Sequence, residues 1–404
     1  MRIATFFVFG LLAAGPSLQA DIVTEASARA CALVTLHTPP GPSRRAMALV
    51  QVSVYEAVNA ISGRYRDGRL ALGMHPEASM DAAVLAATRG ALLDLLREDR
   101  AAVEAWYAEA MARIPEGAAK AAGAELGARA ASGVLALRAE DGAQNPERYR
   151  PRTSPGVYVP TTMPAAPQWP DRKPWLLTTA SQFRPGPPPS LTGEVWARDF
   201  NEVKALGGKA SPKRSPEQTA VARFWEDNGS GIYFGVLRSA AESTGLDPTD
   251  TARLYAVAAM AMDDAIIAVF DAKYAYGFWR PLTAIRNGDQ DGNADTEREP
   301  AWLPLIDTPM HPEYPCAHCI LAASLAEVLE AAPFRGKVPV LATTSLVTPG
   351  IVRRWPTPAA LVQEVADARV WAGVHYRNST QVGEAMGRQV GRWAARVFRE
   401  GVRP

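Results

Sequence analysis

KYAYGFWRP, residues 273–281, is the first of three cationic segments that decide how this chain is interpreted. PCAHC follows at residues 315–319, and RVWAGVH at residues 369–375. Together they hold one lysine, two arginines and two of the five histidines in the chain. Guanidinium groups bind the oxygens of a tetrahedral oxyanion bidentately, and a lysine adds a point charge. The segments therefore predict one oxyanion-binding site, with both histidines left for acid–base chemistry.

The spacing within the first and third segments predicts how their side chains are placed. Lys273 and Arg280 are seven residues apart, so one continuous helix would put both on the same face, two turns apart. Arg369 and His375 are six residues apart. Gly373 between them predicts a bend or a close approach of another chain segment.

The second segment is predicted to begin a helix. Pro315 stands just ahead of an apolar run at helical spacing over residues 320–329. Cys316 to His318 would then form the first turn, whose N–H groups have no partner within the helix. Such a terminus is suited to binding an anion.

The three segments resemble the pattern of a known superfamily, that of vanadium-dependent haloperoxidases, bacterial acid phosphatases and type 2 phosphatidic acid phosphatases. Its pattern is Lys-x6-Arg-Pro, then Pro-Ser-Gly-His, then Ser-Arg-x5-His-x3-Asp. The matching positions, with both internal spacings intact, are Lys273, Arg280, Pro281, Pro315, His318, Arg369 and His375. Residues 46–61, 156–160, 183–189 and 311–315 also read like soluble bacterial haloperoxidase-type proteins. The resemblance implies an all-α helical bundle of the acid phosphatase/vanadium haloperoxidase type.

The resemblance also implies roles for individual residues. His375 would coordinate vanadium or attack phosphorus, and His318 would be the acid–base partner. The remaining oxyanion-binding positions would be Lys273, Arg280, Cys316, Ala317 and Arg369.

The chain departs from the family pattern at three supporting places. Cys316-Ala317 replaces Ser-Gly, Ala368 replaces the serine before the arginine, and Ser379 replaces the aspartate after the histidine. Loss of that aspartate removes the expected group that orients the ring of His375. Another group must therefore fix its tautomer.

The first function that the resemblance implies is a vanadium-dependent haloperoxidase-like enzyme. It would bind vanadate and use peroxide to oxidise a halide or an organic substrate. The second is a periplasmic acid phosphatase, which would hydrolyse phosphate esters through a phosphohistidine and need no cofactor. The third is a non-catalytic oxyanion-binding relative. A free thiol beside a peroxide-activating centre is open to oxidation, whereas a phosphatase avoids this difficulty.

Cys316 and Cys319 form a Cys-x-x-Cys motif around His318. One interpretation is a redox switch, or a thiolate that takes part in the anion site. The other, which the absence of a βαβ context favours, is a local structural disulfide or two small packed side chains.

Bulk composition is that of an ordinary enzyme. The chain has 404 residues, a net charge of +1, 48% hydrophobic and 21% charged residues. This balance favours a small-molecule substrate or anion as partner over nucleic acid or a membrane surface, and leaves the oligomeric state open.

Residues 1–20 read as a secretory signal cleaved near Ala20, which predicts a periplasmic or secreted protein. The later apolar stretches are too short to predict an integral membrane segment in the mature chain.

Four regions are expected along the chain. After the signal peptide (1–20), residues 21–142 predict an N-terminal helical layer and residues 143–213 a proline-rich irregular belt. Residues 214–404 predict the helical core that carries the three-part site. The part from 21 to 404 is expected to be one integrated domain. Three aromatic residues in the belt predict that it packs on the helices: Trp169, Trp175 and Phe183.

Local signals mark several helices. Apolar residues at helical spacing over 47–61 are followed by Ser62-Gly63, and SPEQ at 215–218 is a capping box with proline at the first helical position. A helix from about 248 to 271 leads to the first cationic segment. Within that helix, Asp263 and Asp264 are expected to pair with arginines. No alternating series predicts a strand.

Overall fold

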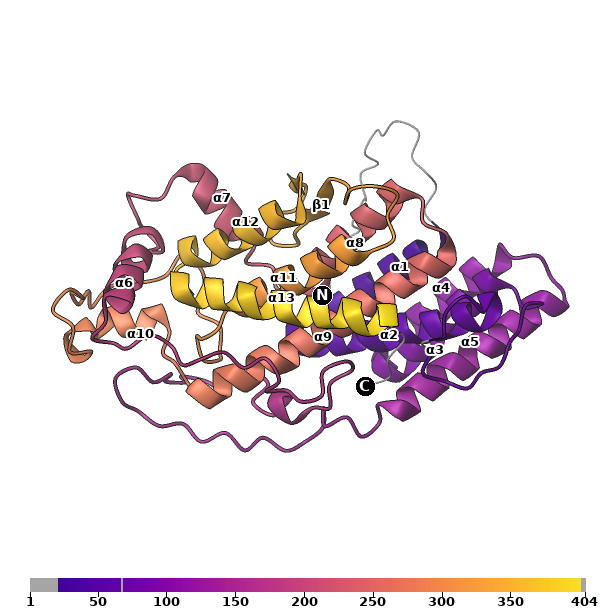
Figure 1. Cartoon of the computed structure of the whole chain (residues 1–404), viewed down its shortest axis with the longest axis horizontal. Coiled ribbons are helices and arrows are strands. Elements are labelled where there is room, and N and C mark those ends of the chain that lie inside the picture. The colour runs from indigo at the N-terminus through magenta and orange to yellow at the C-terminus, as the bar shows by residue number, and fades with distance from the viewer. Residues whose placement is uncertain (1–20, 67, 401–404) are drawn as a thin grey trace, which may run out of the picture.

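The computed structural model describes residues 21–66 and 68–400, and its regular structure is almost entirely helical (Figure 1). The first five helices gather at one end of the molecule (Figure 1). They are α1 (Ile22–His37), α2 (Pro40–Ser62), α3 (Met80–Leu95), α4 (Arg100–Ala112) and α5 (Ala118–Leu137). The predicted stop of α2 is present, because Gly63 takes the left-handed conformation directly after it. The predicted signal peptide lies outside the described residues.

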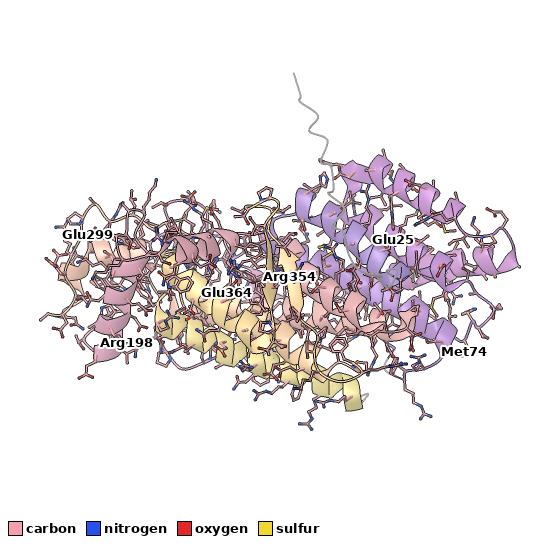
Figure 2. All side chains as sticks on the ribbon, turned by 90° about the horizontal axis from the view of Figure 1, so that it is seen from above. Glu25, Met74, Arg198, Glu299, Arg354 and Glu364 are labelled. Carbon is pink, nitrogen blue, oxygen red and sulfur yellow. The ribbon has the colours of Figure 1, made fainter. Side chains whose placement is uncertain are left out.

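The C-terminal part of the chain supplies the remaining helices. They are α6 (Glu194–Leu206), α7 (Pro216–Phe224), α8 (Ser230–Thr244), α9 (Pro248–Tyr276), α10 (Pro281–Arg286), α11 (Ala317–Ala331), α12 (Pro358–Trp371) and α13 (Arg377–Glu400). The predicted capping box starts α7, with Ser215 and Gln218 bonding each other's backbone. Viewed from above, Arg198 and Glu299 mark one end of the molecule, and Glu25 and Met74 mark the other (Figure 2).

α9 is the central element of the fold. It has 29 residues, begins with the Asp247 side chain capping its first turn, and packs against α2, α11 and α13. One hydrophobic cluster includes buried residues from α1 through to α13, with Val23 and Val397 near its two ends in sequence. The prediction of an all-α bundle is confirmed. The division of the chain at residues 142 and 213 stays a prediction.

The proline-rich belt runs between α5 and α6 along the lower edge of Figure 1 and has only one short 3₁₀ turn, Trp169–Asp171. It is attached to the helices by its aromatic side chains. Trp169 and Trp175 are buried, and Phe183 packs edge-on against Trp393 of α13. The expectation that these aromatics pack on the helices is confirmed.

The single helix that would put Lys273 and Arg280 on one face does not form. α9 ends at Tyr276, and Gly277 adopts the left-handed conformation that stops it. Arg280 is the extended residue immediately before α10, whose first position is Pro281. The two cations therefore approach the site from consecutive elements and not from one helical face.

A short antiparallel hairpin was not predicted. β1 (Leu341–Thr344) pairs with β2 (Val352–Trp355), and β1 packs on α8. Each strand has only four residues, which is too short for a periodic pattern to stand out. None of the helices in the described chain combines the length and the apolar character of a bilayer span.

Candidate functional site

The three cationic segments meet where α9, α11 and the α12–α13 junction come together. Lys273 Nζ donates to the carbonyl oxygens of Pro312 (2.9 Å) and Glu313 (2.7 Å), in the segment that leads into α11. Arg280 Nη1 donates to the carbonyl of Val374 at 2.8 Å and lies 3.2 Å from His375 Nε2. Residues far apart in sequence are thus brought into one buried cluster.

Arg369 and His318 complete this cluster from the other side. Arg369 is in the last turn of α12, and Nη1 donates to the carbonyl of Trp225 at 2.6 Å. Its charge acts on both Cys316 and His318. Gly373 has φ +80° and passes so close to Gly207 that a Cβ there would lie 2.3 Å from the Gly207 carbonyl oxygen. The predicted close approach at Gly373 is confirmed.

The three cations of the site are buried without carboxylate partners. Lys273 is 0% exposed, and Arg280 and Arg369 are each 1% exposed. Among residues 21–66 and 68–400, no carboxylate forms a salt bridge with any of them. Burial lowers the pKa of Lys273 well below its usual range and that of Arg280 to about 10. A bound anion would compensate this buried positive charge.

Hydrogen-bond donors also remain available on these cations. Lys273 has three donors and uses two on backbone carbonyls. Arg369 has five and donates one hydrogen bond, while its Nε is buried with no partner. These donors have no acceptor among the described protein groups, so they are free to bind the oxygens of a tetrahedral oxyanion.

His375 is oriented by Glu313, a residue that the sequence did not identify as functional. Glu313 Oε1 lies 2.7 Å from His375 Nδ1 and also accepts the backbone N–H of Tyr376 at 3.1 Å. Because Arg280 donates toward Nε2, the ring carries its proton on Nδ1 and presents a lone pair at Nε2. Glu313 therefore takes the place of the missing aspartate, whereas Ser379 Oγ is farther away, at 3.4 Å from Nδ1.

Glu313 is fully buried, although charged groups lie close to it. Burial raises its pKa to about 7, against the opposing effects of Lys273 and Arg280. Its Oε2 atom is buried and has no hydrogen-bond partner among the described residues. The only signal in the sequence was a glutamate within the HPEYP stretch that leads to the second motif, which alone did not indicate a partner for His375.

His311 was also missed. Its Nδ1 lies 2.9 Å from Arg280 Nη2, and its carbonyl accepts from Arg280 Nε at 2.9 Å. The ring packs on Phe270, with a centroid distance of 5.2 Å. Burial holds the pKa of His311 well below its ordinary value, so it is neutral. It therefore acts as an acceptor that fixes the guanidinium plane of Arg280.

His318 is placed as a neutral base. It lies in the first turn of α11 and is 8% exposed. Burial, with the charge of Arg369, lowers its pKa well below 6.5, although a hydrogen bond to the Asp227 backbone acts in the opposite direction. Its Nε2 atom is buried and has no partner among the described residues. That atom is available to accept a proton from a bound molecule.

The predicted helix start in the second segment is confirmed. Cys316 is the N-cap of α11, and its Sγ accepts the N–H of Cys319 at 3.4 Å. Its carbonyl accepts the N–H of Ile320 at 3.2 Å. The N–H groups of Ala317 and His318 have no backbone partner in the described structure. They can bind an anion at the positive end of the helix.

Cys316 and Cys319 are two thiols in this structure. Their sulfurs are 2.8 Å apart, with Cys319 donating to Cys316. The disulfide considered from the sequence stays a prediction.

Asp263 and Asp264 lie outside the cationic cluster. Arg172 pairs bidentately with Asp263 at 2.7 and 2.8 Å. Their expected role as structural partners is confirmed for Asp263, whereas Asp264 accepts backbone N–H groups instead.

Comparisons with known proteins show which family and fold this chain resembles. Residues 253–404, which contain all three segments, match the family model of the VCPO second helical-bundle domain. A vanadium chloroperoxidase of Curvularia inaequalis is 24% identical over 270 residues, which cover 50% of this chain and 44% of that protein. The chain thus matches less than half the length of this curated relative.

Two solved structures have a similar fold over nearly the whole chain. A bacterial vanadium-dependent iodoperoxidase superposes with a TM-score of 0.79 at 23% identity, covering 94% of this chain and 98% of that one. An apo-type bacterial vanadium-dependent chloroperoxidase gives a TM-score of 0.72 at 16% identity, covering 91% and 96%. Both likenesses concern the fold.

Proposed function

We propose that this chain, whose residues 253–404 match the VCPO second helical-bundle domain and whose fold resembles bacterial vanadium-dependent haloperoxidases, is a haloperoxidase-type enzyme that binds vanadate and uses peroxide to oxidise a halide or an organic substrate. One observation carries the proposal. The Nε2 lone pair of His375 lies in a buried cluster of three cations that have no carboxylate partner among the described residues.

The residue types present fit a vanadate ion. A neutral imidazole is a good ligand for a transition metal, and here its other nitrogen is held by Glu313. Lys273, Arg280 and Arg369 have the charge and the donors that negatively charged oxygens require. Bound vanadate would supply a Lewis-acidic centre that activates peroxide.

The protein's own residues would have separate tasks. Lys273, Arg280 and Arg369 would bind the oxygens, with the N–H groups of Ala317 and His318 at the start of α11. His318 Nε2 would take a proton from the incoming peroxide and return it to the departing oxygen. Burial of the cluster would exclude water and strengthen each of these contacts.

The test is oxidation of iodide and bromide by the purified protein with peroxide, with and without vanadate. We expect activity that needs vanadate and that His375→Ala abolishes. His37→Ala is the matched control, because His37 lies on α1 and pairs with Asp99. Correctly folded protein that oxidises neither halide with vanadate present would overturn the proposal. Hydrolysis of a phosphate ester, inhibited by vanadate, would then favour the phosphatase.

A second variant separates catalysis from binding. His318→Ala should reduce turnover by about 10²–10⁴-fold, because a positioned acid–base group contributes that much. Vanadate affinity should fall only modestly, since the three cations remain. Unchanged turnover in this variant would remove His318 from the mechanism.

We also propose that the protein is exported to the periplasm or secreted, on the basis of its first 20 residues. Mass spectrometry of the mature protein from the native host tests this. A mature N-terminus at Asp21 is the expected result, and retention of residues 1–20 would contradict it.

A further inference from the structure

The two cysteines at the start of α11 are arranged as a reacting pair. Both side chains are 0% exposed, and the Sγ atoms of Cys316 and Cys319 are 2.8 Å apart. A disulfide bond is about 2.05 Å long, so a shift of less than about 1 Å would join the two sulfurs. The pair begins the helix that carries His318, and Lys273 and Arg369 act electrostatically on both thiols.

The two thiols differ in character. Burial opposes ionisation of Cys316, but the hydrogen bond from Cys319 and the charge of Arg369 lower its pKa to about 7. Burial and the neighbouring sulfur instead raise the pKa of Cys319 well above its usual range. Cys316 is therefore the nucleophile, and Cys319 is the thiol that can resolve an oxidised Cys316.

Cys31 provides an internal contrast. It is buried in α1, its nearest polar partner is Thr35 Oγ1 at 3.9 Å, and burial raises its pKa to about 11. Among the described residues Cys31 is a free cysteine with no disulfide partner. A buried thiol of this kind is unreactive, so Cys31 is a matched control within the same molecule.

We propose that Cys316 and Cys319 are a redox-active dithiol that peroxide converts into a disulfide, and that the disulfide is the form in which the site binds its oxyanion during turnover. The Cys316 sulfur attacks one peroxide oxygen, the O–O bond breaks, and the departing hydroxide is protonated to water. The Cys319 sulfur, having lost its proton, then displaces hydroxide from the Cys316 sulfenic acid. Two thiols and one peroxide give one disulfide and two waters.

This chemistry makes cysteine compatible with a peroxide-using site. A lone thiol beside peroxide continues to sulfinic acid, which is irreversible, whereas a resolving thiol diverts the sulfenic acid into a disulfide. Cys316 is the N-cap of α11, so a thiolate there places negative charge beside the N–H groups that are proposed to bind the oxyanion, and oxidation removes that charge. The loss of a weak S–H donor matters less than the loss of that charge, so oxyanion affinity should rise about fivefold.

The first experiment concerns the thiols alone and uses no vanadate. Protein that has been reduced and freed of reductant is treated with hydrogen peroxide, denatured, alkylated and analysed by mass spectrometry. We expect the peptide with Cys316 and Cys319 to lose about 2 Da and escape alkylation. Cys31 should be alkylated as before. Alkylation of all three cysteines after peroxide treatment would overturn the proposal.

Two variants and one control variant test the division of roles. In Cys319→Ser, peroxide should carry Cys316 to sulfinic acid, a gain of about 32 Da. In Cys316→Ser, Cys319 should stay a thiol, while Cys31→Ser should form the disulfide like the parent protein. Equal oxidation of Cys319 in the Cys316→Ser variant would contradict the assignment of the nucleophile. Circular dichroism before treatment checks that each variant is folded.

The last arm connects the pair to the proposed function, on which its role in turnover rests. Vanadate affinity is measured calorimetrically on reduced protein and on the disulfide form. About fivefold tighter binding by the disulfide form is expected, and weaker binding would overturn its role as the working form. Failure of either form to bind vanadate, with the disulfide still formed, would refute the proposed function and leave the redox pair standing.

Discussion

Two clusters of buried charge in this protein are built in opposite ways. The anchor cluster, Arg172, Asp141 and Asp263, fixes the proline-rich belt to α9, and its arginine pairs with both carboxylates, at 2.7 Å to Asp263 and 3.1 Å to Asp141. The cations of the oxyanion site, Lys273, Arg280 and Arg369, donate only to backbone carbonyls and histidine nitrogens. Both clusters are fully buried, so burial alone does not distinguish structure from function. What distinguishes the oxyanion site is that none of its cations forms a salt bridge with a carboxylate among the described residues.

The largest expected effect is a difference in stability between variants of the two clusters. Arg172→Met leaves Asp263 and Asp141 buried with less compensation, and should lower the free energy of unfolding by about 3–5 kcal/mol. Arg369→Met removes a buried charge that has no carboxylate partner among the described residues. It should therefore change the free energy of unfolding by less than about 1 kcal/mol. Urea denaturation measures both. Equal losses in the two variants would mean that the site cations are structural like those of the anchor cluster.

A second prediction concerns Glu313, the carboxylate that contacts His375 in the described structure. Glu313→Gln keeps the size of the side chain but removes the charge that holds the Nδ1 proton of His375. Halide oxidation should fall by about 10–100-fold, as for other groups that orient a metal-binding histidine. Asp141→Asn, in the anchor cluster, is the control: folded protein of that variant should keep its activity. A Glu313→Gln enzyme with full activity would show that Glu313 does not orient His375.

A third prediction moves the orienting carboxylate to the family position. Ser379 Oγ lies 3.4 Å from His375 Nδ1, so an aspartate there has access to the same proton. Ser379→Asp added to Glu313→Ala should recover about tenfold of the activity that Glu313→Ala loses. Ser379→Asp alone should be harmful, because it places a second carboxylate beside Glu313. No recovery in the double variant would mean that the position of Glu313 itself is required.

The smallest effect is a pH dependence of stability. Burial raises the pKa of Glu313 to about 7, above the value of 4.5 that is ordinary for the unfolded chain. Its contribution to stability is therefore complete below about pH 4.5 and is lost as the pH rises through 7. The Tm of Glu313→Gln relative to the parent protein should rise by about 2 °C between pH 4.5 and pH 8. The neutral histidines are common to both proteins and cancel in this difference.

Asp264, next in sequence to Asp263 of the anchor cluster, gives the matching comparison of pH dependence. Burial raises its pKa to about 6, although it accepts the N–H groups of Trp175, Leu176 and Leu177. Asp264→Asn should show the same sign of pH dependence over a lower range, between about pH 4 and 6. Oxidation activity of the folded variant should be unaffected. An opposite slope in either variant would contradict the assigned direction of its pKa.

Sequence predicted the helical bundle and the meeting of the three cationic segments, because spaced motifs and helix signals are local patterns. It did not predict Glu313 as the partner of His375, since that contact joins residues 62 positions apart and replaces a local one. It left the path from Lys273 to Arg280 open, because seven residues fit two helical turns as well as a Gly277 stop and a new helix. The four-residue strands carried no periodic signal.

The most direct test of the central claim, that unpaired buried cations form an oxyanion site, is calorimetric titration of vanadate into the parent protein and Arg369→Met. We expect one vanadate per chain in the parent protein and at least about 100-fold weaker binding in the variant, from loss of a buried charge-assisted contact. Arg172→Met, where it remains folded, should bind like the parent protein. Equal vanadate affinity in the parent protein and Arg369→Met, or no binding by either, would contradict the account.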